Sequence, residues 1–324
     1  MARLVASVDA WQRAHAVGGF PVAVVKKFNE DHATNLSALI AYYAFFSLFP
    51  LLLVFVSTLG FVLQDNPSLR EEVVDTALGR IPVIGAQVRD QVHPLTGSGI
   101  GLAVGLIGAV WASLGVTLAF GQAFAEIWDV PRLDRPSGLK ARTRGLAVLV
   151  ILGVTLIVAT ALAGVAVGAH LGGGFGAAVE RVAAVAISLA GNVVVILAIF
   201  ALLTPRPRTV RDLLPGVALA AVGVLALQSA GAWYVKHAIA GATGTYGTFA
   251  LVIGLLLWFW IGSNLLLVAA EANVVLRWRL WPRSLTGELE AADRAALERL
   301  AGRARADSRE RIAVSFGTTH KKRE

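Results

Sequence analysis

Six long apolar stretches without a charged residue constrain this chain more than any other feature of its sequence. A helix needs roughly 20 apolar residues to cross the hydrocarbon core of a bilayer, and each stretch reaches that length. A β-barrel would instead show alternating segments of about 10 residues, whereas these stretches are apolar on all sides. The sequence therefore predicts an all-α, polytopic membrane protein with transmembrane helices at about 36–63, 100–124, 145–168, 182–203, 213–235 and 246–270.

The positions of the basic residues predict the orientation of these helices. Segments rich in Lys and Arg stay on the cytoplasmic side of a membrane. If the N-terminus is cytoplasmic, the cytoplasmic segments hold 24 of the 29 Lys and Arg residues. The first 35 residues also lack the short apolar core and cleavage site of a signal peptide. We therefore expect both termini in the cytoplasm.

This topology divides the chain into three parts. We expect a cytoplasmic N-terminal amphipathic segment at 1–35, a transmembrane domain at 36–276 with an extracytoplasmic cap at 64–99, and a basic cytoplasmic tail at 277–324. Acids and bases between 288 and 311 are mixed at helical spacing, which predicts a solvated helix with i, i+4 pairs. Arg277, Arg279 and Arg283 lie beside tryptophans, so we expect them to contact anionic lipid headgroups. Membrane lipids are thus the expected partners, nucleic acid is not, and a homo-oligomer remains an open alternative.

Residue types that carry catalysis are sparse in this sequence. The chain has no cysteine, and its 6 histidines are scattered without the spacing that directs two imidazoles at one metal ion. We found neither a Gly-rich phosphate loop nor the elbow that exposes a nucleophilic serine. The sequence therefore predicts a protein that is not an enzyme and that holds no cofactor or metal.

Small residues and one proline shape the expected packing of the helices. Gly101, Gly105, Gly108 and Gly115 recur on one stripe of the second stretch, which predicts close approach of a neighbouring helix. Within the first stretch lies Pro50, which has no N–H to donate to the carbonyl four residues earlier, so we expect a kink. The kink has two readings: a curve that fits the neighbouring helices, or a hinge that shapes a cavity. Tyr43 and Ser47 lie on the affected turns and are candidates to satisfy the freed carbonyl.

A few polar side chains lie within or beside the apolar stretches. A buried amide costs free energy unless it is paired, so each one indicates either a bond between helices or a polar cavity. Glu271 is the one acid attached to a stretch, and with Arg277 close by we interpret it as ion-paired, a coupling role being the alternative. Because the six cores hold no ionisable group, a proton relay within them is not expected. The candidate cavity or coupling residues are Tyr43, Ser47, Pro50, Asn192, Gln228, Asn264 and Glu271.

Four segments of the sequence carry a resemblance to a known family. They are KKFNEDHATNLSALIAYYAFFSLFPLLL, GLIGAVWASLGVTLAFGQAFAEIWDV, PGVALAAV and TYGTFALVIGLLLWFWIGSNLLLVAAEANVV, which together resemble the YihY/virulence factor BrkB family over roughly residues 20–280. The resemblance implies a protein of the bacterial cytoplasmic (inner) membrane with six transmembrane helices. Members have also been labelled ribonuclease BN, a label that fits poorly here because metal-dependent RNA hydrolysis needs clustered ligands to activate water.

Two functions remain from the sequence. The first is a transporter or permease, in which the first helix, Asn192 and the polar faces of the fifth and sixth helices enclose a path for a small solute, ion or lipid-like molecule. The second is a non-transporting envelope scaffold that binds partner proteins through its outer cap and its tail. We favour the first, since a kinked helix and amides within the membrane suit a cavity better than a scaffold.

Overall fold

The computed structural model describes residues 2–62, 99–168, 174–205, 209–234, 248–285, 289–305, 307 and 309–316, and these residues form helices and no strand. The all-α prediction is therefore confirmed for this part of the chain. The predicted cap at 64–99, except Gly99, lies outside it. The helices are α1 (Ala2–Ala14), α2 (Ala16–Glu30), α3 (Ala33–Val62), α6 (Gly99–Ile127), the 3-10 helix η2 (Arg132–Asp134), α7 (Gly138–Gly168), α8 (Gly174–Leu203), α9 (Val210–Tyr234), α11 (Thr248–Trp278) and α12 (Ala291–Arg303).

Five of these helices are long and apolar enough to cross a membrane within the described residues. The spans are Ala33–Val54, Ala103–Ile127, Val182–Leu203, Val210–Ala230 and Val252–Trp278. Large apolar side chains on them remain exposed, as Trp111 is at 76% and Ile107 at 71%, which suits a surface that faces lipid. The chain is thus a polytopic membrane protein. The remaining predicted span, 145–168, lies in α7, which is not among these five.

Helices α6 and α11 continue beyond the ends of the second and sixth predicted spans. We placed their ends at 124, two residues before Glu126, and at 270, directly before Glu271, but α6 continues to Ile127 and α11 to Trp278. The helices extend because Glu126 and Glu271 have cationic partners, Arg135 at 2.9 Å and Lys27 at 3.7 Å. A charge at the end of an apolar run therefore did not end either helix. The candidate span Val252–Trp278 includes Glu271, which directly follows the predicted core 246–270.

The glycine stripe of α6 packs against α3. A Cβ atom added to Gly108 would lie 3.2 Å from the Pro50 ring, and one added to Gly115 would lie 2.6 Å from the Tyr43 ring. These glycines let the two backbones approach closely, as the spacing of the small residues predicts. Helix α3 passes through Pro50 and continues to Val62. Ser47 Oγ donates to the carbonyl of Ala44 at 2.7 Å and not to that of Phe46, so the proposed rescue of the freed carbonyl by Ser47 is wrong.

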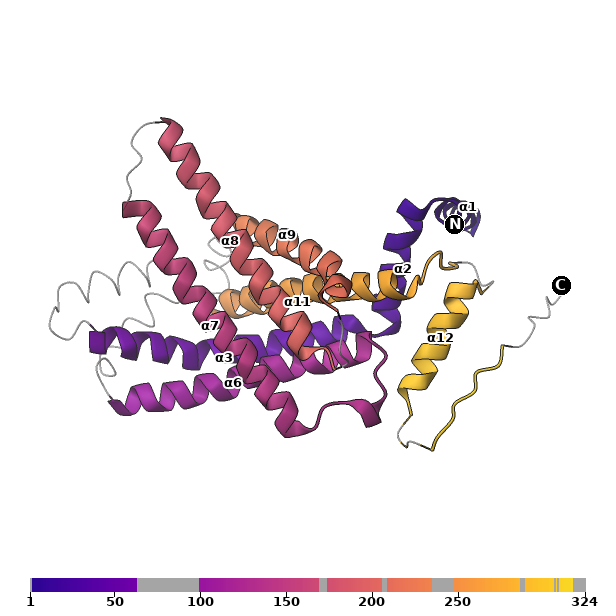
Figure 1. Ribbon diagram of the computed structural model, residues 1–324, viewed down its shortest axis with the longest axis horizontal. Coiled ribbons are helices and arrows are strands. Elements are labelled where there is room, and N and C mark those ends of the chain that lie inside the picture. The colour runs from indigo at the N-terminus through magenta and orange to yellow at the C-terminus, as the bar shows by residue number, and fades with distance from the viewer. Residues whose placement is uncertain are drawn as a thin grey trace.

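The core lies toward one end of the bundle, where α3 and α9 begin and where α6, α8 and α11 end. The terminal helices α1, α2 and α12 lie at this same end, with α12 running across it (Figure 1). The helix predicted in the tail is present as α12, but Ala296 and Asp293 are buried, so one face docks on the bundle while Arg294, Glu298 and Arg299 stay exposed. The apolar positions between its charges provide the docked face.

Candidate functional site

A cluster of buried charges lies where α2, α6, α11 and α12 meet. We call Lys27, Asp31, Asp129, Glu271 and Arg303 the charge cluster. Lys27 Nζ lies 2.5 Å from Asp31, 3.6 Å from Asp129 and 3.7 Å from Glu271. Arg303 Nη1 lies 3.0 Å from Asp31 and 3.8 Å from Asp129. The cluster thus joins four segments that are far apart in sequence.

Local structure directs each side chain of the charge cluster inward. Lys27 and Asp31 are one helical turn apart at the end of α2, so they face the same way. Asp129 follows the end of α6 in a left-handed conformation, φ 47°, which Asp tolerates better than most residues. Glu271 is fully buried, and neither of its carboxyl oxygens accepts a hydrogen bond from the described residues. Its only charge partner there is Lys27.

The carboxylates of the charge cluster favour the protonated, cationic form of Lys27. Burial by itself would lower the pKa of Lys27, but the carboxylates of Glu271, Asp31 and Asp129 outweigh it and raise the pKa above its ordinary value of 10.5. Burial also raises the pKa of Asp129 from 3.8 to about 6, although Lys27 and Arg303 act in the opposite direction. Asp129 therefore keeps its proton to a higher pH than an ordinary aspartate does.

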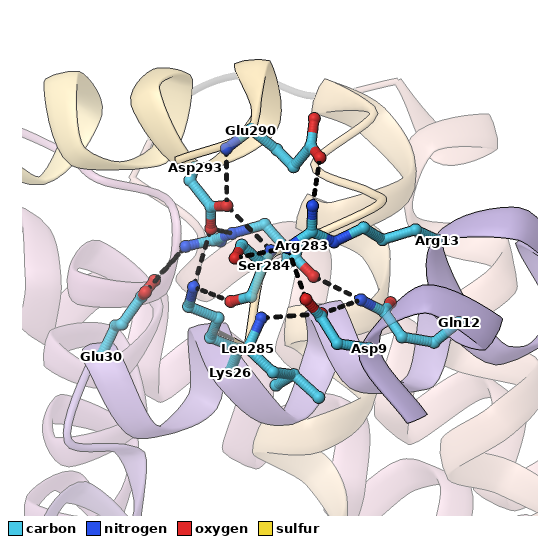
Figure 2. Close-up of polar contacts among 10 residues, drawn as sticks. All are labelled: Asp9, Gln12, Arg13, Lys26, Glu30, Arg283, Ser284, Leu285, Glu290 and Asp293. Carbon is cyan, nitrogen blue, oxygen red and sulfur yellow. Dashed lines mark hydrogen bonds and ion pairs between the residues drawn. The ribbon is translucent and has the colours of Figure 1, made fainter. Parts of the chain in front are cut away.

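A second polar network joins the two ends of the chain (Figure 2). Arg283, in the segment after α11, donates to Asp293 Oδ1 at 2.6 Å and to Glu30 at 2.7 and 3.0 Å. Lys26 donates to the same oxygen of Asp293 at 2.8 Å. Burial alone would raise the pKa of Asp293, but the hydrogen bonds from Lys26 and Arg283 outweigh it and lower the pKa. Asp293 is therefore held as a carboxylate between α2 and the tail.

Helix α1 completes this network, which we call the terminal clasp. Gln12 donates to the carbonyl of Arg283 at 2.6 Å, Asp9 accepts from the backbone N–H of Leu285 at 2.9 Å, and Arg13 donates to Glu290 at 2.8 Å (Figure 2). The N-terminal segment and the tail, which we predicted as separate parts, thus contact each other.

The clasp also corrects two expectations about the arginines after α11. Arg283 is fully buried and cannot contact lipid headgroups as predicted. Arg277 pairs with Asp212 at 3.3 Å, so the cation beside Glu271 is Lys27 rather than Arg277. Only Arg279 and the half-exposed Arg277 remain accessible.

Two of the candidate amides, Asn192 and Gln228, form a pair. Asn192 on α8 and Gln228 on α9 exchange two hydrogen bonds of 3.3 Å, so these side chains link two helices. On its other side, Asn192 lines a cavity of about 370 Å³ between α7 and α8, together with Leu152, Thr155, Ile187, Ser188, Gly191 and Val195. Asn192 therefore contacts α9 on one side and borders a cavity on the other.

The other candidates lie apart from this cavity. Asn264 donates to the carbonyl of Trp260 in its own helix at 2.7 Å, and Ser47 bonds within α3. Tyr43 and Pro50 pack against glycines of α6, and Glu271 belongs to the charge cluster. Hydrogen bonds among the described residues join only Asn192 and Gln228 of the seven candidates. Their roles in a cavity or in coupling stay predictions.

Sequence reasoning missed Lys27, Asp31, Asp129 and Arg303 as members of a site. We counted Lys27 and Arg303 only as evidence for orientation. One signal was available, because the i, i+4 pair Lys27 and Asp31 lies beside the apolar positions Ala23 and Val24 and so on a face that can be buried. Within the described part of the chain, no group of three or more His, Asp or Glu residues is arranged to hold a metal ion.

Comparisons with known proteins agree with this architecture. The family described as "Virulence factor BrkB" matches residues 24–294, which include every described span. The chain is 25% identical to "Inner membrane protein YhjD" of Escherichia coli (strain K12) over 81% of this chain and 82% of that protein. It is 24% identical to "Putative ribonuclease-like protein YfkH" of Bacillus subtilis (strain 168) over 78% of this chain and 93% of that protein. No solved structure matches this chain significantly. The predicted family is thereby confirmed: this chain belongs to the virulence factor BrkB family and is a multi-pass protein of the inner membrane.

Proposed function

We propose that this protein is a transporter or permease for a small solute, ion or lipid-like molecule. The cavity between α7 and α8 carries this proposal, because it lies near the middle of the span Val182–Leu203. Its lining combines the polar groups of Thr155, Ser188 and Asn192 with apolar walls. Binding sites for small molecules commonly have this composition, with few polar groups that orient the ligand.

The proposal includes six membrane spans with both termini in the cytoplasm. Helix α7 has 31 residues, enough to cross a bilayer, and would provide the sixth span. The terminal clasp supports placing both ends of the chain on one side of the membrane, because α1 and α2 contact α12 and the segment before it. The basic residues near these ends favour the cytoplasmic side.

The charge cluster provides ionisable groups for coupling. A transporter that uses a proton gradient needs a buried carboxyl group whose charge a partner can balance. Glu271 and Asp129 have this setting beside Lys27. We do not propose a hydrolytic activity for this protein.

Single cysteines test the cavity, because the chain has none of its own. Ser188→Cys places a thiol in the cavity, and Val194→Cys places one on a half-exposed face of the same helix. A membrane-impermeant thiol reagent is applied to intact cells and to inverted vesicles. We expect labelling at Ser188→Cys from at least one side and none at Val194→Cys.

Two further cysteines test the topology in the same assay. Arg142→Cys precedes the apolar part of α7, and His170→Cys follows the helix in sequence. We expect Arg142→Cys to label only in inverted vesicles and His170→Cys only in intact cells. If Arg142→Cys labels but Ser188→Cys stays silent in both preparations, no aqueous path reaches the cavity and the transport proposal fails.

The scaffold remains the second candidate, and the terminal clasp favours it. The clasp gives the tail a defined fold, and a folded surface at the end of a bundle suits the binding of another protein. A silent cavity together with a partner that crosslinks to α12 would support the scaffold.

A further inference from the structure

A second cavity lies at the end of the bundle that carries the terminal helices. It measures about 370 Å³ and lies between the last turns of α6, the start of α7 and the end of α8. Leu36, Leu118, Ala125, Ala141 and Leu203 give it apolar walls. Because the spans of α6 and α8 end here, the cavity lies at the boundary between hydrocarbon and headgroups.

Three charged side chains line this cavity, two of them cationic. Arg135 is committed to Glu126 at 2.9 Å and donates to the carbonyl of Val130 at 3.3 Å. Glu126 also pairs with Arg303 at 3.2 Å, so its charge is balanced. Arg144 has no carboxylate partner in the described residues, and its Nη1 is buried without a hydrogen bond. The lining therefore holds one guanidinium whose charge is uncompensated.

Close packing of α6 and α7 fixes the position of Arg144. The next residue, Gly145, is buried against Thr117 of α6, and a Cβ atom at this position would clash with the Thr117 hydroxyl. The glycine thus brings the first turns of α7 against α6. A buried donor without a partner costs free energy, so a ligand that accepts its hydrogen bond is favoured.

Two glycines that line the cavity leave part of its volume unfilled. Cβ atoms added to Gly121 or Gly138, which both line it, would meet no atom within 4 Å. An occupant can therefore lie directly against the backbone of α6. This space adjoins the apolar walls, so the favoured ligand carries an anionic group and a hydrocarbon chain together.

We propose that this cavity binds an acidic phospholipid, with its phosphate at Arg144 and the start of its acyl chains against Leu118 and Leu203. Basic pockets between transmembrane helices bind acidic headgroups in this way. Guanidinium and phosphate form strong, charge-assisted hydrogen bonds. The inference requires the membrane-spanning helices but neither transport nor the orientation of the chain, so it stands or falls independently of the proposed function.

The test measures how phospholipids stabilise the full-length protein in neutral detergent micelles. Phosphatidylglycerol and phosphatidylcholine are titrated separately while the apparent melting temperature is followed. We expect phosphatidylglycerol to raise it saturably and phosphatidylcholine to have little effect. Arg144→Gln should shift the midpoint at least tenfold, whereas Arg142→Gln, which removes an exposed arginine on the same helix, should keep it within about twofold.

A steric variant keeps the test decisive if Arg144→Gln folds poorly. Gly121→Leu fills the cavity without a clash at its Cβ atom and exchanges a weak helix former for a strong one. We expect this variant to melt like the wild type without lipid and to lose the response to phosphatidylglycerol. Equal stabilisation of all variants by phosphatidylglycerol would overturn the proposal. So would an equal response to inorganic phosphate, which would identify a site for a free anion.

Discussion

Replacing Asp129 with Asn tests whether the charge cluster holds an excess acid. The variant removes an ionisable group, and Asn tolerates the left-handed conformation at φ 47°. Burial raises the pKa of Asp129 from 3.8 to about 6, which corresponds to about 3 kcal/mol at 1.36 kcal/mol per pH unit. The folded state thus binds this proton more tightly than the unfolded state.

The sign of the pH dependence follows from this tighter binding. The contribution of Asp129 to stability is fully present below about pH 4 and is lost as the pH rises through about 6. Above that pH, the wild type bears the cost of a buried negative charge that Asn avoids. We therefore expect Asp129→Asn to be more stable than the wild type at pH 7.5 by up to about 3 kcal/mol, with the difference shrinking toward pH 4.

Unfolding by SDS in mixed micelles, followed at pH 5, 6 and 7.5, measures this difference. Asp134→Asn is the matched control, because Asp134 is exposed and lies in the neighbouring η2. We expect its difference from the wild type to stay small at every pH. If Asp129→Asn is instead less stable at pH 7.5, the ionised carboxylate stabilises Lys27 and Arg303 more than its burial costs, and the reasoning is refuted.

Three other predictions concern packing, the clasp and catalysis. Gly108→Leu forces a side chain into the contact of α6 with α3 and should lower the unfolding free energy by about 1–3 kcal/mol. Gly153→Leu, at an open position, should not lower it. Equal melting temperatures for the two variants would contradict this prediction. Arg283→Met leaves the buried carboxylate of Asp293 with fewer partners and should make the tail accessible to limited proteolysis. Arg279→Met, at an exposed position, should not have this effect. A tail that resists proteolysis equally in both variants would argue against the clasp. Purified protein incubated with tRNA and divalent cations should leave the RNA intact, and cleavage that copurifies with the protein would refute the expectation that it is not an enzyme.

The membrane-spanning helices could be predicted because their signal is local. Transfer of a helix into hydrocarbon sums over consecutive residues, so an uninterrupted run such as 182–203 identifies a span by itself. The glycine spacing in α6 was equally informative, since Gly105, Gly108 and Gly115 face α3. The ends of α6 and α11 were less predictable. A carboxylate at the end of an apolar run suggests that the helix ends there, unless the cation that pairs with the carboxylate is known.

Contacts between distant segments decided the rest. Sequence alone determined the family, the helical class and most of the apolar spans, since these depend on residue order over one helix or on matching motifs. Tertiary structure alone decided that Glu271 meets Lys27 rather than the nearby Arg277, and that Arg283 is buried by Glu30 and Asp293. An ion pair forms only between groups that are close in space, and its free energy depends on how much water is excluded around it. The spacing of residues along the chain determines neither quantity.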